Sequence, residues 1–243
     1  MWNDLQFILK WSNDNQGTLS IIIFAVTLAL GWGSGIFRTL RQKPNLKIAH
    51  LPGPTFCCTY LTGEKNGEFD IHRTGFALYL HVVNIGSAST SIERISIGYR
   101  WNILPFSKLW IKYGLGWFWI ENQTLALTDF QVRIGEDLKI YPFLTQKSSL
   151  SGGRSETFLE VGRSTNGVVY FEQVDSWGGC SPTVREGKVW LKIQIIDVFG
   201  KKHQTKIAIP FVSFEEARRY NPAFGKTLAS LKGKPLPVDV KLA

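Results

Sequence analysis

Cysteine, histidine and long apolar runs are all scarce in this chain of 243 residues. Its three cysteines are two neighbours, Cys57 and Cys58, and the distant Cys180. Adjacent cysteines cannot form a disulfide without backbone strain. The three together have neither the spacing of a disulfide framework nor that of a metal site. We therefore expect reduced thiols and no bound metal.

Catalytic signatures are lacking as well. The sequence contains no phosphate loop, no nucleophile elbow and no HExxH pattern. The four histidines are scattered, and His81 falls inside an alternating apolar segment, where a packing role is commoner than a catalytic one. We expect a non-enzymatic protein without catalytic residues or a cofactor. An anchored hydrolase with an unrecognised site is a third alternative, behind the two given below.

Only one long apolar run occurs. Residues 17–37, GTLSIIIFAVTLALGWGSGIF, carry no charge and lie between Asp14 and Arg38. About 20 apolar residues at about 1.5 Å per residue match a hydrocarbon core of about 30 Å. Such a run must be helical in lipid, because only a helix satisfies its own backbone groups there. The sequence therefore predicts a single transmembrane helix over 17–37.

Acidic residues are missing after this run until Glu64, whereas basic residues are frequent there. The cations are Arg38, Arg41, Lys43 and Lys47. The positive-inside rule then places residues 38–243 in the cytoplasm and the N-terminal tail outside the inner membrane. A cleaved signal peptide is the alternative. It would need a basic start and a shorter apolar core, whereas residues 1–16 contain Asp4, Lys10 and Asp14.

One face of the predicted transmembrane helix is rich in small and polar side chains. Its spacing of three and four residues marks a single helical seam. Small residues let helices approach closely in lipid, and hydroxyl groups can bond across the contact. The seam is a candidate self-association interface or pore lining, with Phe24 as the constriction. A second small stripe, Ala25, Ala29 and Gly33, competes with it. The candidate residues are Ser20, Phe24, Thr27, Gly31 and Ser34.

The sequence predicts one β domain for the remainder of the chain. Apolar residues alternate with period two over 75–84, and the runs 189–195 and 206–211 flank a turn, which predicts a hairpin. Ser213 and Glu216 have capping-box spacing, which predicts a short helix over 214–220. We expect a mainly β fold, an Ig-like sandwich or a barrel. The expected parts are an amphipathic extracytoplasmic tail (1–16), a basic linker (38–44), the cytoplasmic β-sandwich (45–220) and a basic C-terminal tail (221–243).

Two resemblances add to this interpretation. Residues 79–88, YLHVVNIGSA, resemble the strand-then-turn pattern V-x-N-x-G-x-A of many bacterial Ig-like modules. An N-terminal span followed by a cytoplasmic β domain is also similar in layout to small membrane effectors of bacterial anti-phage systems. In those families a sensor domain binds a nucleotide-type signal and controls membrane damage. The second resemblance is one of layout, so no residue roles carry over from it.

The formal net charge of +9 favours anionic partners. Residues 94–120 contain no acid, and cations alternate with aromatic residues there. Cations follow a phosphate backbone and aromatic faces stack on bases, a combination suited to a nucleotide or to single-stranded nucleic acid. Contact with anionic lipid headgroups and plain core packing are the alternatives. The candidate binding residues are Arg94, Arg100, Trp101, Lys108, Trp110, Lys112, Tyr113 and Trp117.

Together these features suggest a membrane-anchored effector or sensor. Its β domain would bind an anionic nucleotide-type ligand, and its span would self-associate into a homo-oligomer that forms a pore or signals. The expected partners are the lipid bilayer, further copies of the chain and the ligand. The main alternative, from another functional class, is a monomeric membrane-anchored adaptor that recruits a protein partner.

Overall fold

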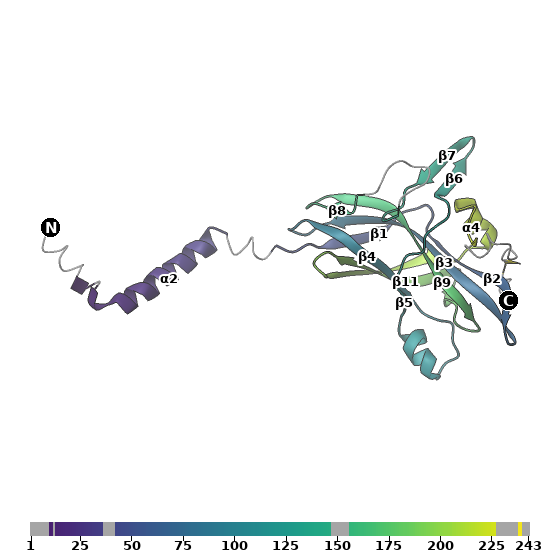
Figure 1. Ribbon diagram of the computed structural model, residues 1–243, viewed down its shortest axis with the longest axis horizontal. Helices are drawn as coiled ribbons and strands as arrows, with labels where there is room; N and C mark the ends of the chain where they lie inside the picture. Colours follow the sequence, from purple (N-terminus) through teal and green to yellow (C-terminus); the bar gives the residue numbers. More distant parts are fainter. Residues whose placement is uncertain (1–9, 12, 36–41, 147–155, 227–237, 240–243) are drawn as a thin grey trace. The chain divides into compact units, whose positions relative to one another are not determined.

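The computed structural model describes residues 10–11, 13–35, 42–146, 156–226 and 238–239 (Figure 1). The chain divides into two compact units, Met1–Lys43 and Pro44–Ala243.

The first unit contains α2, Gln16–Gly33, the one helix within the described residues that is long and apolar enough to cross a membrane. Its mean hydropathy is 1.5. The helix ends four residues before the predicted boundary. Ser34 donates its backbone N–H to Leu30, and Gly35 adopts a φ of +80°. A glycine in that conformation commonly ends a helix. Most of the predicted N-terminal tail (1–9 and 12), and residues 36–37 of the predicted span, lie outside the described residues.

The first sheet of the second unit is built around its longest strand, β3 (Phe69–Asn84). One edge of β3 pairs with β9 (Ser164–Trp177), and the other edge pairs in succession with β2 and β1. A short fifth strand, β13, joins β2 on its outer side. The remaining bounds are β1 Leu46–His50, β2 Phe56–Asn66 and β13 Val238–Asp239.

The second sheet has β11 (Lys188–Asp197) between β4 (Thr90–Tyr99) and β12 (Lys202–Pro210). The outer edge of β4 pairs with β8 at its beginning and with β5 at its end. The short strand β10 pairs with the beginning of β11. The bounds of these short strands are β5 Phe118–Ile120, β8 Phe158–Leu159 and β10 Val184–Arg185.

The pairing order is that of an Ig-type sandwich. The first sheet contains β1-β3-β9 and the second β12-β11-β4, which correspond to the A-B-E and G-F-C strands of Ig domains. A parallel bridge between Cys57 and Phe211 joins the two sheets along one side. This confirms the predicted class, a mainly β sandwich with an apolar N-terminal helix and a short C-terminal helix.

The first core lies between the two sheets. Alternate residues of β3 point inward from one side, among them Phe76 and Leu78, and Ile97 and Ile193 face them from the second sheet. All four side chains are fully buried. The period-two alternation in the sequence therefore corresponds to one buried face on each strand.

The opposite face of the first sheet is covered as well. Tyr60 and Tyr170 on that face pack against the hairpin β6–β7 (Phe130–Ile134 and Asp137–Tyr141) and against α4 (Phe214–Tyr220). In Figure 1 this hairpin and α4 lie together on one side of the sheets. This second core was not predicted from the sequence. A two-layer sandwich is thus extended by a third, partial layer.

The C-terminal helix begins as predicted, because Ser213 accepts a hydrogen bond from the backbone N–H of Glu216 at 3.2 Å. The packed unit, however, continues beyond Tyr220. Phe224 is only 2% exposed in the second core and lies against Gly75, where an added Cβ would be 2.6 Å from its ring. The predicted tail boundary at 221 is therefore too early, because an aromatic residue after α4 completes the core.

Candidate ligand-binding cleft

The segment after β4 is held in extended form beside a second loop. The carbonyl of Arg100 accepts the N–H of Thr183 at 2.9 Å, and Asn102 donates to Ser181 at 2.8 Å. Gly179 permits this approach, because a Cβ there would lie 2.4 Å from the Asn102 carbonyl oxygen. The chain therefore leaves β4 in a fixed direction at one end of the second sheet.

A short π-helix, η1 (Trp110–Leu115), then brings the chain back over this segment; it is the helical turn beyond β5 in Figure 1. Ser107 begins the turn by accepting the N–H of Trp110 at 3.0 Å. The carbonyl of Tyr113 accepts the N–H of Trp101 at 3.0 Å. The turn ends at Gly116. Only glycine fits there, because a Cβ would lie 2.1 Å from the Lys112 carbonyl oxygen.

Four aromatic rings hold this loop against the first core. The centroid of Trp101 lies 4.5 Å from that of Tyr113 and 4.6 Å from that of Phe118. Phe118 in turn lies 5.5 Å from the fully buried Tyr99. Such aromatic pairs add stabilisation beyond their buried area. Trp101 and Tyr113 therefore have a clear structural role.

Beside these rings lies a cleft of ≈ 540 Å³, which we call the indole cleft. This volume lies in the range of about 300–1,000 Å³ that is usual for small-molecule sites. It is lined by Arg100, Trp101, Asn102, Ile103, Trp110, Gly114, Leu115, Trp117, Thr183, Arg185, Trp190 and Lys206.

The charge of the indole cleft is entirely positive among these twelve described residues: three are cations and none is an acid. Two of the cations share one indole. The guanidinium carbon of Arg100 lies 5.1 Å from the ring centroid of Trp117, and the Lys206 ammonium nitrogen lies 5.8 Å from it. Both distances are within the reach of cation–π attraction. The third cation is Arg185.

This arrangement suits an anionic aromatic ligand. Guanidinium and ammonium groups donate charge-assisted hydrogen bonds to phosphate, and indole faces stack on nucleobases. Four of the lining residues are tryptophans. Thr183 and Asn102 add neutral polar groups to the same lining.

The structure divides the eight binding residues expected from the sequence. Arg100, Trp101, Trp110 and Trp117 line the indole cleft, and Tyr113 supports it from the aromatic cluster. The other three lie elsewhere. Arg94 pairs with Glu121 at 3.5 Å, Lys112 lies over the Tyr113 ring at 4.8 Å, and Lys108 is outside the lining. Segment 94–120 is therefore not one continuous binding surface.

Of the charged and aromatic lining residues, three were not predicted from the sequence: Arg185, Trp190 and Lys206. They come from β10, β11 and β12, which reach the cleft through sheet pairing. One signal was available in the sequence. Trp190 occupies an outward position in the alternating strand β11 and is 54% exposed. Trp110, Trp117 and Trp190 line the same cleft, and several apolar side chains gathered on one surface, unlike a single one, indicate a binding site.

A second cleft, of ≈ 650 Å³, shares Trp101 with the indole cleft and includes Glu172 and Asp175 in its lining. Both carboxylates are already engaged within the protein. Tyr60 donates its hydroxyl to Glu172, and Arg73 pairs with Asp175. Burial raises the pKa of Glu172, and the Tyr60 hydrogen bond and the Arg73 charge oppose that rise. In the part of the chain that the structure describes, no three His, Cys, Asp or Glu side chains are grouped to hold a metal.

Neither protein-family models nor curated protein sequences give a match to this chain.

The candidate seam on α2 is exposed along its length. The hydroxyls of Ser20, Thr27 and Ser34 donate to carbonyls of the same helix at 2.9, 2.8 and 3.1 Å. These groups would therefore enter lipid with their hydrogen bonds already made. Phe24 is 65% exposed, and no α2 residue is buried. The seam, with Gly31 between its hydroxyls, is available for contact with a second helix.

Proposed function

We propose that this protein is a non-enzymatic, membrane-anchored effector or sensor that binds a nucleotide- or oligonucleotide-type anion in the indole cleft. The observation that supports this most directly is the composition of the lining. Three cations and four indoles face one cavity of ≈ 540 Å³, without an acid among its described residues. Phosphate needs the cations, and nucleobases need the flat aromatic faces.

The membrane part of the proposal uses α2 as a single transmembrane anchor with the β domain in the cytoplasm. The helix has the length and composition of a span, and the basic residues that follow it favour this orientation. Copies of α2 associate through the seam of Ser20, Phe24, Thr27, Gly31 and Ser34, directly or around a pore. Ligand binding in the cytoplasm then changes the assembly of the spans.

The first experiment uses the full-length protein extracted from membranes in detergent. Its mass is measured by light scattering and its absorbance at 260 nm is compared with that at 280 nm. We expect a defined oligomer with excess absorbance at 260 nm. A monomer without this excess would contradict the proposal. Mass spectrometry of the same sample shows whether residues 1–37 are retained, as an anchor requires and a cleaved signal peptide does not.

A second candidate function is a monomeric adaptor that recruits a protein partner. It is favoured by the exposed apolar side chains around η1, including Leu104 at 82% and Phe106 at 90% exposure. Exposed apolar patches of this kind commonly mark protein contacts. The two functions are distinguished by substituting Phe106 and Leu104 with serine. This change leaves nucleotide binding and oligomer mass intact under the first proposal, and abolishes partner capture under the second.

A further inference from the structure

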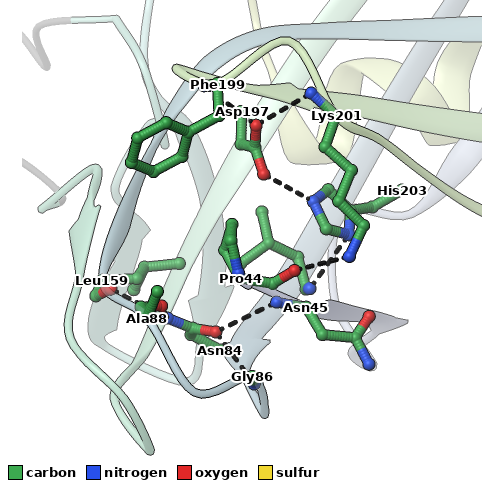
Figure 2. A network of polar contacts seen from close by, with 11 residues as sticks. Pro44, Asn45, Asn84, Gly86, Ala88, Leu159, Asp197, Phe199, Lys201 and His203 are labelled. Atoms are coloured by element: carbon green, nitrogen blue, oxygen red, sulfur yellow. Dashed lines mark hydrogen bonds and ion pairs between the residues drawn. The ribbon is translucent and has the colours of Figure 1, made fainter. Parts of the chain in front are cut away.

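The chain enters the β domain at a rigid, buried polar network (Figure 2). Leu46 donates its N–H to His203 Nδ1 at 3.0 Å, and His203 Nε2 lies 2.8 Å from Asp197 Oδ2. Because Nδ1 accepts, Nε2 carries the proton and donates it to the carboxylate. Both side chains are almost completely buried, at 3% and 0% exposure. The network therefore fixes the first residues of the domain to the β11–β12 turn.

Three further hydrogen bonds complete this attachment. Lys201 Nζ donates to the carbonyl of Pro44 at 2.6 Å. The backbone N–H groups of Phe199 and Lys201 donate to Asp197 Oδ1 at 3.0 and 2.9 Å. The turn that carries Phe199 is thus held in one conformation, and Figure 2 shows the Phe199 ring turned away from the network.

Asn84 attaches the neighbouring turns at the same end. Its side-chain oxygen accepts from Gly86 at 3.0 Å, and its nitrogen donates to Ala88 at 2.8 Å and to Leu159 at 3.1 Å. Asn84 itself is fully buried. The V-x-N-x-G-x-A pattern therefore gives this end of the sandwich a defined shape.

Large apolar side chains stand at the tips of these fixed turns, each at least half exposed. Backbone hydrogen bonds place them together: Ile85 donates to Asn45 at 2.8 Å and Val198 donates to Ser91, the strand partner of Phe158, at 3.1 Å. We call this set the entry face. It consists of Ile85, Phe158, Val161, Val198 and Phe199.

On the basis of the membrane anchor proposed above, we infer that the entry face binds the headgroup layer of the same bilayer. Only ten residues, 34–43, separate Gly33 from Pro44, and ten residues extend to at most about 35 Å. With α2 in the membrane, the first residue of the domain can therefore lie no farther than about 35 Å from Gly33. Arg163, Lys201 and Lys202 border the apolar tips, and Glu160 is paired with Arg163 at 3.4 Å. Apolar tips bordered by cations are suited to an anionic membrane surface.

A consequence concerns the indole cleft. Strand β4 runs from Thr90, beside the entry face, to Tyr99, beside the cleft. Its ten residues span about 30 Å at about 3.4 Å per residue. With the entry face on the bilayer, the cleft and the apolar loop around Phe106 face away from lipid. This inference does not depend on what the cleft binds.

The test uses the full-length protein in vesicles of phosphatidylcholine and phosphatidylglycerol. In a Cys180→Ser background, one cysteine is introduced by Phe199→Cys or, as the matched control at the opposite end, by Phe106→Cys. Cys57 and Cys58 are fully buried and are protected from labelling in the folded protein. Each variant carries an environment-sensitive fluorophore, and spin-labelled lipid is the quencher.

We expect a blue-shifted emission and strong lipid quenching at position 199, and neither at 106. Quenching at 106 without quenching at 199, equal quenching at both positions, or none at either would each overturn the inference. A second variant separates contact from mere proximity. The fluorophore is placed at Val161→Cys, and Val198 and Phe199 are both changed to aspartate. We expect this double change to abolish quenching by lipid while the unfolding midpoint stays the same. Persistent quenching would contradict a binding role for these tips.

Discussion

Lys206 lies over the indole of Trp117, with its ammonium nitrogen 5.8 Å from the ring centroid. Lys206 belongs to β12, whereas Trp117 precedes β5 at the other edge of the same sheet. Strands β11 and β4 lie between β12 and β5, so the contact crosses the outer face of both. Gly98 lacks a side chain, and the Trp119 ring occupies that space, 3.1 Å from where a Cβ would lie. The outer face of the second sheet thus brings distant cations and indoles together.

Charge reversal in the indole cleft should remove nucleotide binding. In the double variant Arg100→Glu and Lys206→Glu, two charge-assisted contacts are lost, and each contributes about 1.5–3 kcal/mol. We expect affinity for ATP and for a short oligothymidylate to fall by about a hundredfold or more. The affinity is measured by following the intrinsic tryptophan fluorescence as ligand is added. The matched control is Lys108→Glu with Lys112→Glu, which changes the same net charge outside the lining. Equal loss in both variants would show that binding depends on overall charge.

The salt dependence of oligonucleotide binding should report the number of engaged cations. Each phosphate neutralised on a single strand contributes a slope of about −0.7 to the plot of log affinity against log salt. With the three cations of the lining engaged, we expect a slope of about −2. Binding isotherms between low and physiological salt provide the measurement. A slope near zero would mean that phosphate is not the recognised group.

The local parts of the fold could be predicted from the sequence. The hairpin β11–β12, the alternation in β3 and the Ser213 cap of α4 each follow from neighbouring residues. Asn166 and Gly167 show the limit of such patterns. Asn-Gly pairs are typical of tight turns, yet this pair lies within β9, and Gly167 is needed because a Cβ would meet the Leu144 backbone at 2.4 Å. That requirement depends on a long-range contact and leaves no local signal.

The candidate site was predictable only in part, for a similar reason. Arg100, Trp110 and Trp117 lie in one aromatic, basic segment that composition alone singles out. Arg185 and Lys206 are ordinary strand cations in the sequence. They become part of the cleft only through the pairing of β10, β11 and β12. The second core was missed likewise, because Phe224 stands in a segment with the composition of a tail.

Phe224 should be essential to the stability of the β domain. Phe224→Ala leaves a cavity among Phe56, Tyr60 and Tyr170, and such changes cost about 3–5 kcal/mol. Chemical unfolding of the full-length protein in detergent, followed by tryptophan fluorescence, measures the loss. Phe106→Ala is the control, since that ring is 90% exposed, and we expect a change within about 0.5 kcal/mol. Similar effects of the two substitutions would contradict the packed position of Phe224.

Glu172 should make the domain less stable as pH rises. Burial raises the pKa of its carboxyl in the folded protein. The folded state therefore holds the proton more tightly than the unfolded state does. The free energy of unfolding then falls as pH rises from the ordinary carboxyl pKa to the raised one. Glu172→Gln keeps an acceptor for the Tyr60 hydroxyl and removes the buried charge.

The expected result is a Glu172→Gln variant that gains stability relative to the natural chain at pH 8 but not at pH 4. Unfolding midpoints at the two pH values, in the same detergent, provide the comparison. Glu121→Gln is the control, because the side chain of Glu121 is 67% exposed. If the unfolding midpoint changed by the same amount between pH 4 and pH 8 in the natural chain, in Glu172→Gln and in Glu121→Gln, the assignment to Glu172 would be contradicted.

The last prediction concerns the contact between spans. Gly31→Leu or Thr27→Leu places a large side chain on the proposed seam of α2, where close approach needs small residues. We expect the oligomer to dissociate or to change its mass in light scattering. Ala29→Leu is the matched control, because residue 29 lies on the opposite face of the helix at about 100° per residue. That substitution also tests the competing stripe of Ala25, Ala29 and Gly33. If Ala29→Leu dissociates the oligomer and Gly31→Leu does not, the helices associate through that second stripe. An oligomer unaffected by any of these changes would mean that the β domains hold it together and that α2 is only an anchor.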